Sequence, residues 1–232
     1  MTSADTTGAG ATEQAQTHQG STGATGSPRT DVTARALRDG VDVTSGAVAL
    51  RVLGGSGPVV LDDGSVRVVA GTGDTEDVRL VVAVAPPLTI DVLRDGTALV
   101  RDGDAPVAGL RAAPEGRLRA RDGAAVLTAP PGTQSRLWFT ARSILDLSWG
   151  DREGGRSLAV TPSDWARAGG LAADALVWAQ LADAEPEART PTMHAQLTCH
   201  QLGARTKATW NLEPWRPHVD ALELVAARCN PT

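Results

Sequence analysis

The stretch CHQLGARTKATWNLEPWRP (residues 199–217), with the closing CNP at 229–231, decides how the last third of this 232-residue chain folds. Thr190-Pro191 suits a helix N-cap and first helical position, so a helix is predicted from there to Gly203, where glycine favours its end. An extended KATWNL and a rigid EPWRP corner follow. After this corner, the alternation in ALELVA (221–226) predicts a last strand with Leu222 and Leu224 on one face.

Both cysteines lie in this last segment, thirty residues apart, at Cys199 and Cys229. They can form a disulfide, remain buried thiols or belong to a metal site. Their spacing lacks the paired ligands of a zinc site, so no metal or other cofactor is expected. The favoured interpretation is a disulfide, which indicates an oxidising compartment.

Composition and charge exclude several classes of protein. The formal net charge of -5 and pI near 5.4 argue against a nucleic-acid partner, because such proteins usually carry a basic surplus. No stretch approaches the roughly 20 apolar residues that a transmembrane helix needs. Oligomeric state cannot be predicted. Of the 22 basic residues only Lys207 is a lysine, so this position is unusual.

Residues 1–30 consist mostly of small and polar residues and predict a disordered tether. They show no basic and apolar regions of a signal peptide. Because this conflicts with a disulfide, three explanations stay open: the true start lies upstream, export uses another route, or the cysteines are not bridged.

Residues 31–130 contain short runs rich in valine and leucine, separated by Asp-Gly turns, and no aromatic residue, histidine or cysteine. Alternation in VALRVL (48–53) and DVRLVVAV (77–84) is typical of half-buried strands. The segment predicts an all-β sandwich or open barrel that serves as a scaffold.

Aromatic residues begin at Trp138 and Phe139, which predicts a second domain over 131–232, with α+β architecture. Leu158 and Val160 should face inward from a strand, and Pro162-Ser163-Asp164 should begin a short helix. In the next helix, LAADALVWAQLADA, the spacing places Leu171, Ala175, Trp178 and Ala182 near one stripe. The chain as a whole is therefore predicted to be α+β.

The motifs REGGRSLAVTPSDWAR, CHQLGARTKATWNLEPWRP and the terminal CNP resemble the C-terminal domain of the actinobacterial domain-of-unknown-function family 2599, over roughly residues 140–232. The resemblance implies an uncharacterised secreted or cell-envelope protein. It implies no established activity, so a function must come from the chemistry of the residues.

The candidate catalytic set is His200, Lys207, Glu213 and Arg216. His200 and Glu213 could transfer protons, and the two cations could hold an anionic transition state, as in a secreted hydrolase of the phosphodiesterase or ribonuclease type. Each residue also has a structural interpretation. Glu213 and Arg216 can form a local ion pair, and His200 can donate to a backbone carbonyl.

The favoured function uses the same residues for binding, with Trp210, Trp215 and Gln196 as further candidates. A rigid surface closed by a disulfide, with an exposed tryptophan and a Lys/Arg pair, could recognise a small anionic, glycan or protein ligand. Both tryptophans can equally be core residues. The sequence therefore predicts a ligand- or envelope-binding module on a β-rich scaffold, with the hydrolase as the alternative.

Overall fold

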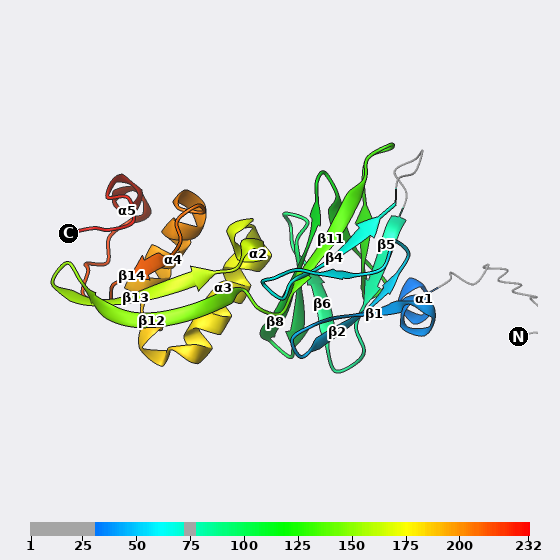
Figure 1. The fold of residues 1–232 in the computed structure, drawn as a ribbon, viewed down its shortest axis with the longest axis horizontal. Helices are drawn as coiled ribbons and strands as arrows, with labels where there is room; N and C mark the ends of the chain where they lie inside the picture. Colours follow the sequence, from blue (N-terminus) through cyan, green and yellow to red (C-terminus); the bar gives the residue numbers. More distant parts are fainter. Residues whose placement is uncertain (1–30, 72–77) are drawn as a thin grey trace, which may run out of the picture. The chain divides into compact units, whose positions relative to one another are not determined.

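The computed structural model describes residues 31–71 and 78–232, and the predicted tether over 1–30 lies outside them. Within these residues the chain forms two antiparallel sheets and then a smaller α+β region with a third sheet (Figure 1). The predicted α+β class is confirmed.

The two N-terminal sheets form a sandwich. In the described residues, the first has the order β1 (Val41–Ser45), β2 (Val48–Leu53), β5 (Val78–Ala83), β10 (Ala124–Thr128), β9 (Arg117–Arg121). The second has the order β3 (Val59–Val60), β4 (Val66–Ala70), β11 (Ser135–Thr140), β8 (Ala105–Ala113), β7 (Ala98–Asp102), β6 (Thr89–Val92). Leu50 and Leu80 of the first sheet share one core with Leu110 and Phe139 of the second. The predicted sandwich is confirmed.

Strand β11 shows where the first region ends. Its residues pair with β4 and β8, and Phe139 is fully buried in the sandwich core. Phe139 therefore does not open a second core, although its neighbour Trp138 packs against the C-terminal core. The change in composition near residue 130 precedes the last strand of the sandwich, and a domain boundary there stays a prediction.

Helix α1 (Val32–Asp39) stands where only strands and turns were predicted. The side chain of Asp31 caps it, accepting hydrogen bonds from the backbone N–H groups of Thr33 and Ala34 at 2.9 and 3.1 Å. Such a cap satisfies N–H groups that the first helical turn leaves unpaired. Ala36 packs against Val81, on the face of the first sheet that does not contribute to the sandwich core.

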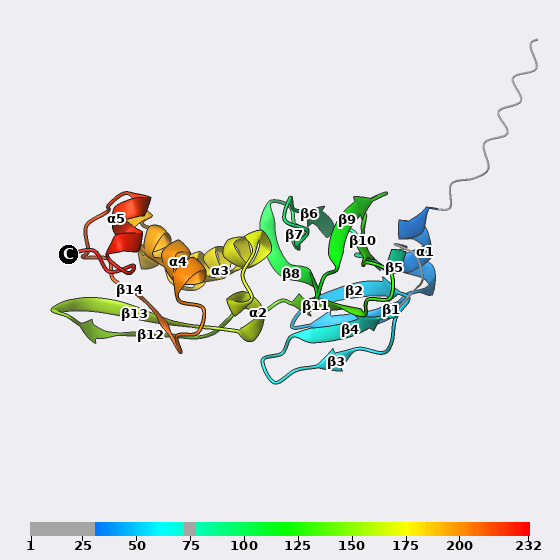
Figure 2. The ribbon, with the colours of Figure 1, turned by 90° about the horizontal axis from the view of Figure 1, so that it is seen from above.

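The α+β region is a three-stranded sheet with helices packed on it. Its elements in the described residues are β12 (Ile144–Arg152), β13 (Gly155–Pro162), α2 (Asp164–Arg167), α3 (Leu171–Ala184), a 3-10 turn (Pro186–Ala188), α4 (Pro191–Gly203), β14 (Trp210–Leu212) and α5 (Ala221–Ala226). The sheet order is β12-β13-β14, and α3 and α4 lie along one face (Figures 1 and 2). Leu158 and Val160 are fully buried, as predicted.

Two local predictions are wrong. The segment ALELVA is helix α5, because the Asp220 side chain accepts a hydrogen bond from Glu223 N at 2.9 Å and begins a helix there. Its alternation is coincidental, since Leu224 is buried while Leu222 is 85% exposed. On α3 the buried residues are Ala172, Ala173, Leu176, Val177 and Leu181, instead of the predicted stripe.

Candidate functional site

Helix α4 brings the first candidate residues against strand β14. Thr190 caps it through a hydrogen bond from Met193 N to Oγ1 at 3.2 Å, and Pro191 occupies the first turn, as predicted. Met193, Gln196 and His200 are all buried, as expected for one face of a helix. The helix therefore presents Gln196 and His200 to the sheet side of the region.

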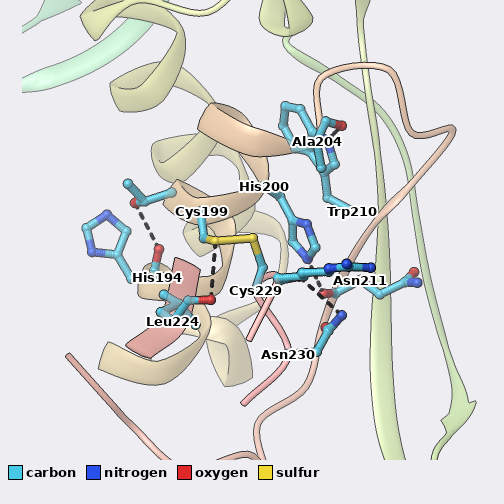
Figure 3. The surroundings of a disulfide bond; sticks show 11 residues. His194, Cys199, His200, Ala204, Trp210, Asn211, Leu224, Cys229 and Asn230 are labelled. Atoms are coloured by element: carbon cyan, nitrogen blue, oxygen red, sulfur yellow. Dashed lines mark hydrogen bonds between the residues drawn. A yellow bond between two sulfur atoms is a disulfide. The ribbon is translucent and has the colours of Figure 1, made fainter. Parts of the chain in front are cut away.

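A disulfide between Cys199 and Cys229 joins α4 to the end of the chain, with the two Cα atoms 5.6 Å apart (Figure 3). The bridge packs with Leu224 of α5 in a small apolar cluster. The predicted pairing is confirmed. The bridge closes a loop of the chain that contains Glu213 and Arg216.

Glu213 and Arg216 form a buried ion pair. Their side chains are 2% and 0% exposed, and Arg216 Nε donates to Glu213 Oε2. Arg216 also donates to Glu153 Oε2 at 2.5 Å and to the carbonyl of Pro231 at 3.0 Å. Although burial lowers the pKa of Arg216, the hydrogen bonds from both carboxylates raise it overall, so it stays charged.

The side chain of Gln196 is fully used in hydrogen bonds to the backbone of Glu213. Its Nε2 donates to the carbonyl of Glu213, and its Oε1 accepts from the N–H of the same residue, both at 2.9 Å. The amide group thus pairs with the Glu213 backbone as another strand would. Because Gln196 is fully buried, this clamp leaves no part of it exposed to a ligand.

His200 is held by one ring nitrogen. Its Nε2 lies 3.0 Å from the carbonyl oxygen of Asn211, and the ring points to this carbonyl in Figure 3. His194 lies on the other side of the disulfide, with its ring centroid 4.2 Å from that of Trp178. The two histidines therefore do not converge, because residues six apart on a helix lie on different faces.

The pKa of His200 is lowered to about 4, mainly because burial disfavours the charged ring, with a smaller contribution from Lys207. The hydrogen bond to Asn211 opposes this shift but does not reverse it. The ring is therefore neutral near pH 7. A carbonyl oxygen only accepts hydrogen bonds, so Nε2 carries the proton and Nδ1 is an acceptor.

This lowered pKa predicts a loss of stability in mild acid. In the unfolded chain His200 becomes protonated below about pH 6.5, whereas in the folded chain it becomes protonated only near pH 4. The free energy of unfolding therefore falls as the pH is lowered across this window. At about pH 5 the expected loss from this group is roughly 2 kcal/mol. Urea denaturation of wild-type protein and His200→Gln at several pH values measures it. The variant should show a shallower decline between neutral pH and pH 5, and parallel curves would contradict the prediction.

A polar cavity of about 230 Å³ brings three of the four candidate catalytic residues together. Its lining residues come from β12 and the turn after it, α4, β14 and the segments on either side of β14, and the C-terminal segment: Arg152, Glu153, His200, Lys207, Thr209, Asn211, Glu213, Asn230. Arg216 is not among them, but it binds both glutamates of the lining. The arrangement therefore contains one internally paired acid cluster and two other cations.

Those two cations are Lys207 and Arg152, and neither has an ion-pair or hydrogen-bond partner for its side chain within the described residues. The carboxylates of Glu153 and Glu213 already bind Arg216, and His200 is neutral. Unpaired cations beside hydroxyl and amide groups attract an anion that can also accept hydrogen bonds.

Arg167 of α2 holds the loop that carries Lys207. The Arg167 guanidinium donates to three carbonyls of the loop, those of Arg205, Lys207 and Ala208. Trp210 Nε1 donates to the carbonyl of Ala204 at 3.0 Å and fixes the start of the same loop. These contacts position Lys207 at the cavity although its own side chain is exposed.

The two tryptophan candidates differ. Trp210 is fully buried and belongs to the core of the α+β region, so its ring is not available to a ligand. Trp215 is 43% exposed and stacks on the Arg216 guanidinium at 4.5 Å. A Cβ at Gly155 would lie 2.3 Å from Trp215, so glycine lets the ring rest directly on strand β13.

Five residues of the cavity were not predicted from the sequence: Arg152, Glu153, Thr209, Asn211 and Asn230. Arg152 and Glu153 lie about fifty residues earlier, in and just after β12, and only the pairing of β12, β13 and β14 brings them near. A signal for Asn230 was present in the sequence, because it follows Cys229 in the closing CNP motif. The bridge from Cys229 to Cys199 brings Asn230 close to α4.

Two further features concern metal ligands and the length of the helices. Among the described residues no three His, Cys, Asp or Glu side chains are grouped in a way that could hold a metal ion. None of the helices in this part of the chain has both the length and the apolar character needed to cross a membrane.

Comparison with other proteins places the region in a family. Residues 144–232 match the family described as "Protein of unknown function (DUF2599)". An uncharacterized protein of Mycobacterium leprae is 36% identical over 98 residues, which are 40% of this chain and 74% of that protein. Uncharacterized proteins of Mycobacterium tuberculosis and Mycobacterium bovis are 43% identical over 83 residues, 32% of this chain and 56% of each relative. The chain thus spans little more than half the length of these two relatives. No solved structure matches.

Proposed function

Because the chain belongs to the DUF2599 family of proteins of unknown function, its role must follow from its own side chains, and we propose that its C-terminal region is a ligand-binding module for a small anionic group. The observation that carries the proposal is the pair of cations, Lys207 and Arg152, that line a polar cavity without an acidic partner in the described structure. Thr209, Asn211 and Asn230 add hydroxyl and amide groups that can bind the oxygens of an anion.

The rigidity of the cavity supports binding. Gln196 and Arg216 both hold Glu213, and the disulfide joins α4 to the chain end next to Asn230. A preformed site loses little side-chain freedom when a ligand enters. The exposed ammonium of Lys207 retains the most freedom, and Arg167 holds its backbone.

The hydrolase has less support. Glu213, its second proton-transfer group, is bound by Arg216, Gln196 holds its backbone, and Ser157 Oγ lies 3.4 Å from its other oxygen. His200 has a pKa of about 4 because it is buried, so its ring is the neutral imidazole and not the imidazolium that a general acid needs at neutral pH.

The proposed location is extracellular or in the cell envelope. The Cys199–Cys229 disulfide supports it, because disulfides persist in oxidising compartments. In this interpretation the β-sandwich is a spacer that presents the binding region.

Calorimetric titration with inorganic phosphate and with acetate tests the proposal. Wild-type protein should bind at least one of these anions at a single saturable site, and Lys207→Met should bind it about tenfold or more weakly, as expected when a charge-assisted hydrogen bond is lost. Arg35→Met, which removes an exposed positive charge from α1, is the matched control and should bind like wild type.

Two results would overturn the binding module. One is the absence of saturable binding of either anion, or equal binding by Lys207→Met. The other is turnover of RNA, phospholipid, peptidoglycan or ester substrates by wild-type protein that His200→Ala and Lys207→Ala both abolish, which would establish the hydrolase instead.

A further inference from the structure

The second ring nitrogen of His200, Nδ1, restricts which chemical groups of a ligand could bind beside it. His200 lines the cavity and is 2% exposed, and its Nδ1 is buried with no hydrogen-bond partner in the described part of the chain. Buried polar atoms in proteins nearly always have a partner, and one that does not requires an explanation.

The chemical character of this nitrogen follows from the other one. Since Nε2 donates to the carbonyl of Asn211, the neutral ring offers Nδ1 only as an acceptor. Burial keeps the pKa of the ring at about 4, so Nδ1 does not become a donor near neutral pH. Whatever pairs with Nδ1 must therefore bring its own hydrogen, as a hydroxyl or amine does.

Other residues of the lining are donors with positive charge and therefore favour a ligand that has an anionic acceptor. Lys207 and Arg152 are donors with positive charge, and both carboxylates of the lining are already bound to Arg216. Among the ligand groups that could donate to Nδ1, a protonated amine would bring a positive charge beside these cations. A hydroxyl brings a donor without this repulsion.

We propose that the ligand is a hydroxylated anion, whose carboxylate or phosphate binds Lys207 and Arg152 while one of its hydroxyl groups donates to Nδ1 of His200. This inference rests on the proposed binding function and names its ligand class. The cavity of about 230 Å³ has room for roughly eight water-sized groups at about 30 Å³ each, the scale of one sugar acid or sugar phosphate.

Five probes separate the parts of this ligand: glucuronate, glucose 6-phosphate, acetate, inorganic phosphate and glucose. In calorimetric titrations at neutral pH, wild-type protein should bind glucuronate or glucose 6-phosphate about tenfold or more tightly than the matching simple anion, because one more buried hydrogen bond forms. Comparison of the two hydroxylated probes distinguishes a sugar acid from a sugar phosphate. Glucose alone should bind more weakly than either.

Two substitutions at His200 separate its nitrogens. The amide of glutamine reaches the position of Nε2, so His200→Gln keeps the donor to Asn211 and loses the acceptor that Nδ1 provides. The shorter asparagine places its polar atoms near Nδ1. The preference, which is the ratio of the dissociation constants of simple and hydroxylated anions, should fall to about one in His200→Gln and recover at least partly in His200→Asn.

Nitrogen-15 NMR of the His200 ring provides a second measurement if a variant does not fold. Glucuronate or glucose 6-phosphate should shift the Nδ1 resonance of wild-type protein, and acetate or phosphate should not. The inference is overturned if simple and hydroxylated anions bind equally well, if His200→Gln keeps the preference, or if Nδ1 does not respond. Saturable, Lys207-dependent binding of simple anions would in each case leave the proposed function standing, whereas no anion binding at all would remove both.

Discussion

Arg216→Met should lower the free energy of unfolding by about 3–5 kcal/mol, the cost of leaving one partner of a buried ion pair uncompensated. The carboxylate that loses its partner is Glu213, whose side chain is 2% exposed. The same change removes the hydrogen bond from Arg216 to the carbonyl of Pro231, which ties down the chain end beside the disulfide. Urea denaturation followed by tryptophan fluorescence measures the effect.

Two variants show whether the buried pair is responsible. Glu153→Gln removes the other carboxylate that binds Arg216, but this side chain is 59% exposed, so the expected cost is at most about 1 kcal/mol. The double variant Glu213→Gln/Arg216→Met leaves no unpaired buried charge and should be more stable than Arg216→Met alone. A loss below about 1 kcal/mol in Arg216→Met would show that the pair is not the closed, desolvated unit described above.

Removal of the disulfide by Cys199→Ala/Cys229→Ala should cost roughly 3–4 kcal/mol in the chain-entropy model, because the bridge closes a loop with a sequence separation of 30. Alanine is the suitable replacement, since both cysteines are almost fully buried in the cluster with Leu224, and serine would bury an additional polar group. The free energy of unfolding of the variant, obtained from urea denaturation, measures this cost.

Reduction of the wild-type protein with a thiol reagent is the control for this prediction. Reduced wild type and the double alanine variant should lose similar stability, whereas the variant should not respond to the reagent. Equal stability of oxidised and reduced wild type would contradict the prediction. Non-reducing mass spectrometry of protein recovered from its native compartment should find no free thiols.

Local patterns in the sequence were sufficient for several strands of the sandwich and for the start of α4, but they misplaced the buried face of α3. The alternation in VALRVL places Val48, Leu50 and Val52 in the sandwich core. Thr190-Pro191 begins α4, and the pairing of Cys199 with Cys229 was available because the chain has no other cysteine.

The pattern failed where a cap or a distant partner decides. ALELVA alternates like a strand, but Asp220 at its N-terminus begins a helix. Asp31 does the same for α1. Phe139 was assigned to a second core by composition, yet its strand pairs with β4 and β8, which no local pattern reveals.

Which candidate residues lie together was easier to predict from the sequence than the state of each side chain. His200, Lys207 and Glu213 lie close in the chain and line one cavity. Their states depend on residues far away, such as Glu153 beside Arg216 and Arg167 beneath the Lys207 loop. Burial of Trp210 and Gln196 likewise follows from packing against α4 and β14, which spacing alone cannot show.

The central claim, that a small anion binds in the cavity beside His200, is tested most directly by NMR titration of the isotope-labelled chain with inorganic phosphate and glucuronate. The side-chain amide signals of Asn211 and Asn230 and the backbone signal of Thr209 should shift together and saturate at one dissociation constant. Signals from the sandwich strands, such as those of Leu50 and Leu80, should stay in place. Shifts that spread over the sandwich, or that persist unchanged in Lys207→Met, would contradict the claim.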